Sequence, residues 1–271
     1  MNHEKKQELY DKKHMVYDYD NDGRSEWFEI TNREYEKRAT VLFRMNRDVL
    51  YDEFSVSGRT DIRWLRFDDL NGDKKDDLIM FSVYRDSVYL SIINLHTLQF
   101  IKKEKFIVSR EAESDQFWDV VCYYIGRIEN ELFFFISSGY SHKPRLFLSY
   151  SIEEERVNNN FYVASPFRDH YIADINNDGK DEIVSIGGGT GNRPNEKFTD
   201  MTSWIFVLGS DLEFLVSPIN IGHYPNAGVQ SNLLEKGKKH LILISQNVNT
   251  ATGEKSKLIL FDDSLRTIKR L

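Results

Sequence analysis

Three stretches of the chain place acidic and amide side chains at the spacing of a cation-binding loop. The best match begins at Asp174 and reads Asp-Ile-Asn-Asn-Asp-Gly-Lys-Asp-Glu up to Glu182, with the apolar residues 183–186 directly after it. Oxygen-bearing side chains stand at positions 1, 3, 5 and 9, and the glycine at position 6 allows the backbone to fold around one point. Ca²⁺ takes roughly six to eight oxygen ligands, and a divalent ion removes the repulsion between crowded carboxylates. The pattern therefore predicts a calcium-binding loop.

The same pattern occurs twice more, at residues 18–26 and 69–77, and the copies are regularly spaced. We call residues 18–26, 69–77 and 174–182 the first, second and third acid loops. The second acid loop has its glycine at position 4, so that Lys74 occupies position 6. The loops begin 51 and then 105 residues apart, which indicates a unit of about 50 residues and a missing copy between the second and third. Residues 126–131 and 235–240 keep the turn before similar apolar runs but have lost the acid array, so we expect no metal there.

Each unit is expected to contain four short β-strands. In the second unit these are residues 62–67, 78–83, 87–92 and 98–101, and the third strands align at 40–43, 88–90, 145–148, 204–208 and 257–261. Short runs of β-branched and aromatic residues bounded by Asn, Asp, Gly and Ser favour strand over helix. Four antiparallel strands repeated in this way predict an all-β fold, a five-bladed β-propeller of four-stranded antiparallel blades. The expected blades are approximately 14–58, 59–110, 111–164, 165–221 and 222–271, after a charged linker at 1–13.

Composition limits the classes of function. The chain of 271 residues is 40% hydrophobic, which is enough for a substantial core, and its net charge is −7. There is no basic stripe with interleaved aromatics, so we expect no nucleic-acid partner, and no apolar run is long enough to span a membrane. The single cysteine, Cys122, lies in an apolar run and is expected to be a buried thiol. The N-terminus lacks the apolar core of a signal peptide, and we expect the chain to be a piece of a longer protein.

The acid pattern followed by an apolar strand, at this spacing, resembles the FG-GAP or VCBS repeats of integrin α-subunit propellers and their bacterial relatives. The resemblance implies side-chain calcium ligands at positions 1, 3, 5 and 9 and a backbone carbonyl ligand at position 7, and hence up to three structural Ca²⁺ ions. The implied ligands are Asp18, Asp20, Asp22, Arg24 and Glu26 in the first acid loop, Asp69, Asn71, Asp73, Lys75 and Asp77 in the second, and Asp174, Asn176, Asp178, Lys180 and Glu182 in the third.

The acid loops allow two other interpretations. An EF-hand needs a bidentate Glu at position 12; the first acid loop has Glu29 there, but the other two have Met80 and Ser185. The loops could also be plain hairpin turns rich in Asn, Asp and Gly. Residues 187–191 are rich in glycine, but no Gly-Lys-Ser/Thr follows them, so a phosphate-binding loop is not predicted.

The loops on the face opposite the calcium are expected to bind a ligand. Candidate contact residues are Tyr140, His142, Arg168, His170, Arg193, Asn195, His223 and Tyr224. We expect a non-catalytic propeller that binds a protein or glycan, in an extracellular or periplasmic setting, either as a free binding module or as the input domain of a receptor. The alternative is a glycoside hydrolase or polysaccharide lyase with its active site at the propeller channel. Its acids would come from outside the acid loops, with Glu111, Glu113, Asp119 and Asp169 as candidates.

Overall fold

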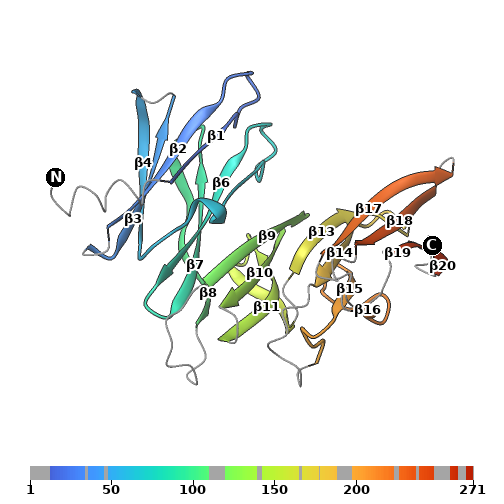
Figure 1. Cartoon of the computed structure of the whole chain (residues 1–271). Coiled ribbons are helices and arrows are strands. Elements are labelled where there is room, and N and C mark those ends of the chain that lie inside the picture. The colour runs from blue at the N-terminus through green and yellow to red at the C-terminus, as the bar shows by residue number, and fades with distance from the viewer. Residues whose placement is uncertain are drawn as a thin grey trace. The chain divides into compact units, whose positions relative to one another are not determined.

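The described part of the chain consists almost entirely of antiparallel β-sheet (Figure 1). The computed structural model describes residues 13–33, 36–45, 48–109, 120–138, 142–164, 167–176, 178–187, 197–222, 226–235, 238–246, 257–261 and 267–270. Their strands form four-stranded sheets in which consecutive strands are neighbours, in the orders β1-β2-β3-β4, β5-β6-β7-β8, β12-β11-β10-β9, β13-β14-β15-β16 and β17-β18-β19-β20. The chain divides into two compact units, Met1–Tyr123 and Tyr124–Leu271.

Unit 1 contains the first two sheets. The first sheet comprises β1 (Lys13–Tyr17), β2 (Glu26–Arg33), β3 (Arg38–Arg44) and β4 (Leu50–Ser57). The second comprises β5 (Leu65–Asp68), β6 (Asp77–Tyr84), β7 (Ser87–Asn94) and β8 (Gln99–Ser109), with the short helix η2 (Ile62–Trp64) before it.

Unit 2 contains the remaining sheets, and β9 (Val120–Ile128) begins just before its boundary. The third sheet continues with β10 (Glu131–Ser138), β11 (His142–Ser151) and β12 (Arg156–Tyr162). The fourth has β13 (Phe167–Ala173), β14 (Glu182–Gly187), β15 (Ser203–Leu208) and β16 (Ile219–Gly222). The fifth has β17 (Asn226–Glu235), β18 (Lys238–Gln246), β19 (Lys257–Phe261) and β20 (Thr267–Arg270).

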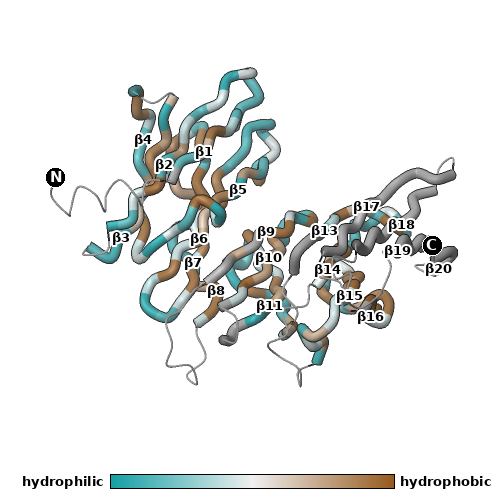
Figure 2. Tube along the Cα trace, viewed as in Figure 1, coloured by the Kyte–Doolittle hydropathy of each residue, from teal (hydrophilic) through white to brown (hydrophobic). Residues whose placement is uncertain are grey.

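The core of unit 1 follows from the side-chain alternation of its strands. Phe28 and Ile30 of β2 are buried with Glu29 between them only half-buried, as expected when one face of a strand packs inward. In β6, by contrast, every residue from 77 to 83 is buried, which shows that both faces of this strand are covered. Figure 2 shows polar residues at the hairpin ends of unit 1 and apolar residues along the strands between them. The two sheets therefore share one apolar core.

Unit 2 has an aromatic core. Phe133, Phe135, Phe147 and Phe206 are fully buried within one cluster drawn from the third and fourth sheets. A buried ion pair lies in the same unit, where Arg145 Nη1 is 3.1 Å from Asp200 Oδ2 and also donates a hydrogen bond to the carbonyl of Ala164. Buried charges are tolerated when they are paired and hydrogen-bonded in this way.

Several predicted elements are confirmed. The expected second, third and fourth strands of the second unit coincide with β6, β7 and β8, and the aligned third strands fall within β3, β7, β11, β15 and β19. Cys122 is buried and unpaired, and burial raises the pKa of its thiol well above the usual value. No helix in the described residues has the length and apolarity to cross a membrane.

Two predictions about local structure are wrong. Residues 62–64 form a 3-10 helix instead of the start of a strand, because the Asp61 carboxylate accepts a hydrogen bond from the backbone N–H of Arg63 and caps the turn. Gly126, for which the sequence predicts a turn, lies inside β9; a Cβ there would lie 2.4 Å from Ile172 Cδ1. The turn is made instead by residues 129 and 130. The predicted linker at 1–13 lies outside the described residues except for Lys13, which begins β1.

Candidate metal centre

The three acid loops occupy equivalent places in their sheets. The first connects β1 to β2, the second β5 to β6, and the third β13 to β14, so that each joins the first two strands of a four-stranded sheet. In each loop the acid at position 9 is also the first residue of the next strand, namely Glu26, Asp77 or Glu182. The sheet therefore holds one end of each acid array in place.

All three loops share one set of hydrogen bonds. The backbone N–H of position 5 donates to the Asp at position 1 over 3.1, 3.2 and 3.1 Å, and to the side chain at position 3 over 3.3, 2.9 and 2.8 Å. The N–H of position 6 donates to the second oxygen of position 1, and that of position 7 to the carboxylate of position 5. Side chains of Asp and Asn that accept from nearby backbone amides fold a loop tightly. The three sequences thus specify the same loop conformation.

The backbone of these loops explains the glycine pattern. Position 6 is left-handed in all three, with φ of +85° at Gly23, +67° at Lys74 and +89° at Gly179. Position 4 is also left-handed in the first and second loops, at Asn21 and Gly72. Glycine adopts this region without strain, whereas a lysine does so at a cost of roughly 1–2 kcal/mol. The second acid loop therefore keeps the shape of the others although its glycine stands at position 4.

The carboxylates at position 9 are buried. Glu26, Asp77 and Glu182 are exposed by only 6%, 1% and 3%. Burial, assisted by neighbouring carboxylates, raises the pKa of Asp77 to about 6 and also raises the pKa of Glu26 and of Glu182. Each accepts a backbone hydrogen bond from position 2, from Tyr19, from Leu70 over 3.2 Å and from Ile175 over 2.8 Å. The fold thus holds three acids where their charged form is disfavoured unless a cation is near.

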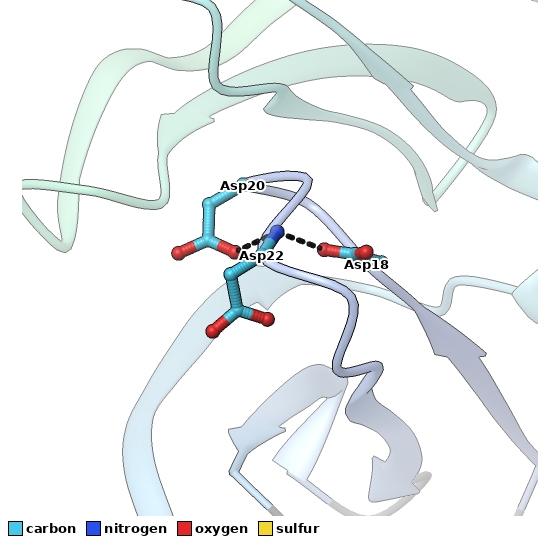
Figure 3. A group of neighbouring side chains, drawn as sticks. All are labelled: Asp18, Asp20 and Asp22. Carbon is cyan, nitrogen blue, oxygen red and sulfur yellow. Dashed lines mark hydrogen bonds between the residues drawn. The ribbon is translucent and has the colours of Figure 1, made fainter.

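The acids of the first and third loops converge. In the first, carboxylate oxygens of Asp18, Asp20 and Asp22 lie within 4.8 Å of one another. Figure 3 shows Asp18 and Asp20 on either side of the backbone N–H of Asp22, from which both accept a hydrogen bond. In the third, Asp174, Asp178 and Glu182 form such a group. The acids of the second loop are not gathered in this way in the described structure, so the three loops differ in how ready they are to take an ion.

Two further observations bear on whether a hard cation fits. Glu26 Oε2 is buried and has no hydrogen-bond partner among the described residues, beside the Asp20 and Asp22 charges that raise the pKa of Glu26. Asn176 donates from its amide nitrogen to Asp178 Oδ2 and to Glu182 Oε1, each over 3.1 Å, so a positive dipole already faces two acids of the third loop. The first loop therefore offers an all-oxygen donor set with an unmet acceptor, which fits calcium, whereas in the third loop the Asn176 nitrogen faces the acids.

The first and second acid loops are joined by residues that the sequence pattern did not single out. The backbone N–H of Asp76 donates to the carbonyl of Tyr19 over 2.8 Å, and the Tyr17 hydroxyl donates to Asp76 Oδ2 over 2.5 Å. The Tyr17 ring also stacks on Phe67 at 4.1 Å. Burial and the Asp76 carboxylate raise the pKa of Tyr17 to about 12. These contacts hold the two loops together, and no pattern along the sequence signals them.

The predicted ligand-face residues are only partly described. His142 lies in β11, and Arg168 and His170 lie in β13, so these three belong to strands and not to loops as expected; β13 extends as far as Phe167, which pairs with Gly187 of β14. His170 is exposed. The predicted contacts Tyr140, Arg193, Asn195, His223 and Tyr224 lie outside the described residues, as do the candidate acids Glu111, Glu113 and Asp119. Asp169 lies in β13.

Comparison with known proteins identifies no family. No family model matches the chain, and no curated protein matches it. Among solved structures, the chain is similar to the dihydro-heme d1 dehydrogenase NirN in complex with DHE (12% identity, TM-score 0.49) and to the Dos1 propeller (12% identity, TM-score 0.48), covering 92% and 94% of this chain. The Vibrio cholerae biofilm matrix protein Bap1 matches at 14% identity and a TM-score of 0.42, over 95% of this chain. The chain spans 45%, 59% and 38% of those three chains, and similarities this distant carry no argument about its function.

Proposed function

We propose that this chain is a calcium-stabilised, five-bladed β-propeller that binds a protein or glycan ligand without catalysing a reaction. In this proposal each four-stranded sheet is one blade, and the ligand binds on the face opposite the acid loops. The protein works in an extracellular or periplasmic setting, where calcium is plentiful, as a binding module or as the input domain of a receptor. The regular strand order of the sheets and the repeat of about 50 residues support this assignment.

The observation that carries the calcium part is the shared geometry of the three acid loops. Each holds a buried carboxylate at position 9 and carboxylates at positions 1 and 5 on the same hydrogen-bonded backbone. In the first loop, one oxygen of that buried acid has no hydrogen-bond partner within the described residues. A bound calcium ion supplies the positive charge that offsets the repulsion and desolvation of these acids.

The expected ligands remain those of the repeat pattern. Side chains at positions 1, 3, 5 and 9 supply oxygens, and the carbonyls of Arg24, Lys75 and Lys180 complete the three sets. Such a set of protein oxygens on a hairpin stabilises the connection between two strands. The role of the ion is therefore structural and not catalytic. The second loop is expected to bind most weakly, because its acids are the least gathered and Lys74 places a positive charge at position 6.

Thermal unfolding with calcium and with a chelator tests the proposal. A ligand present at 100 times its dissociation constant stabilises a fold by about 2.7 kcal/mol per site. Chelation should therefore lower the melting temperature by roughly 5–10 °C per tightly bound ion without abolishing the fold, because the third and fifth sheets lack an acid loop. Titration calorimetry should give up to three sites, and Mg²⁺ at equal concentration should stabilise less. An unchanged melting curve in chelator and in excess calcium would refute the calcium assignment.

A further inference from the structure

At the end of unit 1 opposite the acid loops, three connections of the first two sheets meet. These are the β2–β3 turn, the β4–β5 connection at residues 58–64, and the β6–β7 turn at residues 85–86. The backbone N–H of Gly58 donates to the carbonyl of Lys37 over 2.5 Å. Arg59 and Val83 exchange two backbone hydrogen bonds, of 2.9 and 2.8 Å. We call residues 32, 33, 36–38, 58–64 and 84–87 the basic junction.

Side-chain hydrogen bonds make this junction rigid. The Asn32 amide donates to the carbonyl of Thr60 over 2.9 Å and accepts from the N–H of Thr60 over 3.0 Å. The Thr60 hydroxyl, which is buried, donates to the carbonyl of Phe81 over 2.6 Å. A surface fixed by main-chain contacts between two sheets presents its side chains in a constant arrangement, which lowers the entropy lost when a partner binds.

The charge of the junction is opposite to that of the chain as a whole. Counted from the sequence, residues 32–38, 58–64 and 84–87 carry six basic side chains, Arg33, Lys37, Arg38, Arg59, Arg63 and Arg85, against the four acids Glu34, Glu36, Asp61 and Asp86. Two of the acids already pair with arginines of the junction, Glu36 with Arg33 at 3.3 Å and Asp61 with Arg63 at 3.0 Å. Lys37, Arg38 and Arg85 are exposed, and no ion pair joins them to an acid in the described part of the chain. Positive charge is therefore concentrated here in a protein whose net charge is −7.

The first two acid loops give the other end of unit 1 the reverse balance. Residues 18–25 and 69–76 contain six acidic side chains and three basic ones. Within this unit the acid loops and the basic junction lie at opposite hairpin ends (Figure 1). A ligand rich in carboxylates is thus attracted to one end of the unit and repelled from the other, which sets its orientation as well as its affinity.

The side chains of the junction favour an acidic peptide over a sugar. Five of the six basic residues are arginines, whose planar guanidinium binds a carboxylate through two parallel hydrogen bonds. Sugar-binding surfaces use exposed aromatic rings, but Trp64 is only 3% exposed and Tyr84 is half-buried. Both rings are instead partnered by cations, with the Arg59 guanidinium 5.7 Å from the Trp64 ring and that of Arg85 5.2 Å from the Tyr84 ring. Among the residues of the junction that the structure describes, guanidinium groups are exposed and no aromatic ring face is open.

We propose that the basic junction is the docking surface for an acidic segment of a partner protein, rich in Asp and Glu. This inference rests on the proposed binding function. It names the class of ligand for that part of the face opposite the acid loops which belongs to unit 1. Arg38 and Arg85, at the ends of different turns, contact carboxylates of the bound segment directly. Arg59 is held between the two sheets and adds to the positive electrostatic potential of the junction.

Binding of fluorescently labelled poly-L-glutamate to the full chain tests this surface. Anisotropy should show saturable binding that weakens as salt is raised, because exposed ion pairs are screened. The double variant Arg38→Glu, Arg85→Glu should bind at least about tenfold more weakly, since two attractive contacts become repulsive. The control Lys103→Glu, Arg156→Glu makes the same change in net charge at exposed positions outside the junction, and should stay within about twofold of the unmodified chain. Melting curves of both variants check that the fold is kept.

Each alternative result overturns the inference. Absence of poly-L-glutamate binding, or equal weakening in the control, excludes the junction as the site. Tighter binding of polygalacturonate than of poly-L-glutamate would assign the surface to an acidic glycan instead. The calcium assignment fails separately: if chelation leaves the melting curve unchanged while binding still depends on Arg38 and Arg85, the calcium assignment is wrong and the junction stands.

Discussion

The acid loops and the β9–β10 turn begin the second strand of a sheet in the same way but surround its first residue differently. Glu131 opens β10 as Glu26, Asp77 and Glu182 open β2, β6 and β14. In the β9–β10 turn the hydrogen-bond partners of this carboxylate are neutral side chains, with Asn158 donating to Glu131 Oε1 over 2.6 Å and Ser149 forming a second hydrogen bond. One carboxylate, Glu154, also raises its pKa, and Glu131 Oε2, like Glu26 Oε2, is buried without a hydrogen-bond partner among the described residues. In the acid loops two carboxylates of the same loop raise the pKa of this acid, although Asp77 and Glu182 also have amide partners in Asn94 and Asn176. Four sheets thus share a carboxylate at the start of the strand, and three of them add the acids that a cation needs.

This comparison separates a requirement of the fold from a requirement of the metal. An acid at the first position of the second strand occurs with and without a predicted site, so by itself it indicates no cation. The acids at positions 1 and 5 occur only in the longer loops, where the backbone N–H of position 5 donates a hydrogen bond to the carboxylate of position 1. Replacing the shared acid in loop and turn should therefore have different consequences, which the following variants measure.

The largest expected effect is on calcium-dependent stability. Glu26→Gln and Glu182→Gln each remove a charged ligand and should each abolish roughly 5 °C of the rise in melting temperature that calcium produces. Glu131→Gln should leave that rise unchanged, because Glu131 belongs to no acid loop and accepts its hydrogen bonds from Asn158 and Ser149. Differential scanning calorimetry of the three variants with and without calcium measures this. An equal loss in Glu131→Gln would mean that the shared carboxylate, and not the loop, determines the response.

A smaller effect concerns pH. Burial raises the pKa of Glu131 above its ordinary 4.5, with Ser149 and Asn158 acting in the opposite direction. The folded chain therefore holds this proton more tightly than the unfolded chain, so the contribution of Glu131 to stability is complete below about pH 4.5 and is lost as pH rises through the folded pKa. We expect the free energy of unfolding of Glu131→Gln, relative to that of the unmodified chain, to rise between about pH 4 and about pH 7. The rise should be less than about 1 kcal/mol, because partial exposure screens the charge, and urea unfolding at several pH values measures it. An advantage that shrinks with pH would contradict the raised pKa.

The smallest expected effect sharpens the comparison among the acid loops themselves. Lys74 is left-handed at position 6, where the other loops have glycine. Lys74→Gly should raise the free energy of unfolding by about 0.5 kcal/mol, the relief of strain less the added entropy of the unfolded chain. The control Lys75→Gly, one residue on and without a positive φ, should lower stability by a similar amount. Chemical denaturation with a chelator present measures both. A loss of stability in both variants would show that the conformation of residue 74 is not strained.

Much of the fold was predictable because its signals are local and repeated. Alternation along β2, continuous apolar runs in β6 and β10, and turn residues between them located most strands. The acid loops were found because their chemistry requires side chains at fixed spacing. The start of the second sheet was misassigned at Ile62 because a single cap by Asp61 outweighed the β-propensity of Ile and Trp.

Contacts between sheets could not be predicted in this way. Tyr17 and Asp76 are 59 residues apart, and nothing in either neighbourhood indicates that one hydrogen bond joins two acid loops. The basic junction was missed for the same reason: its cations are distributed over three turns, so the sequence shows no continuous basic stripe. Charge that gathers only through tertiary structure leaves no pattern along the chain.

One glycine determines how closely the first two sheets approach. Gly58 has a φ of +81°, and a Cβ at this position would lie 2.0 Å from the carbonyl oxygen of Val83. The two main chains are therefore in direct contact, with no side chain acting as a spacer. Any larger residue would force these sheets apart and carry Arg59 away from Trp64. The geometry of the charged surface therefore depends on residue 58 having no Cβ.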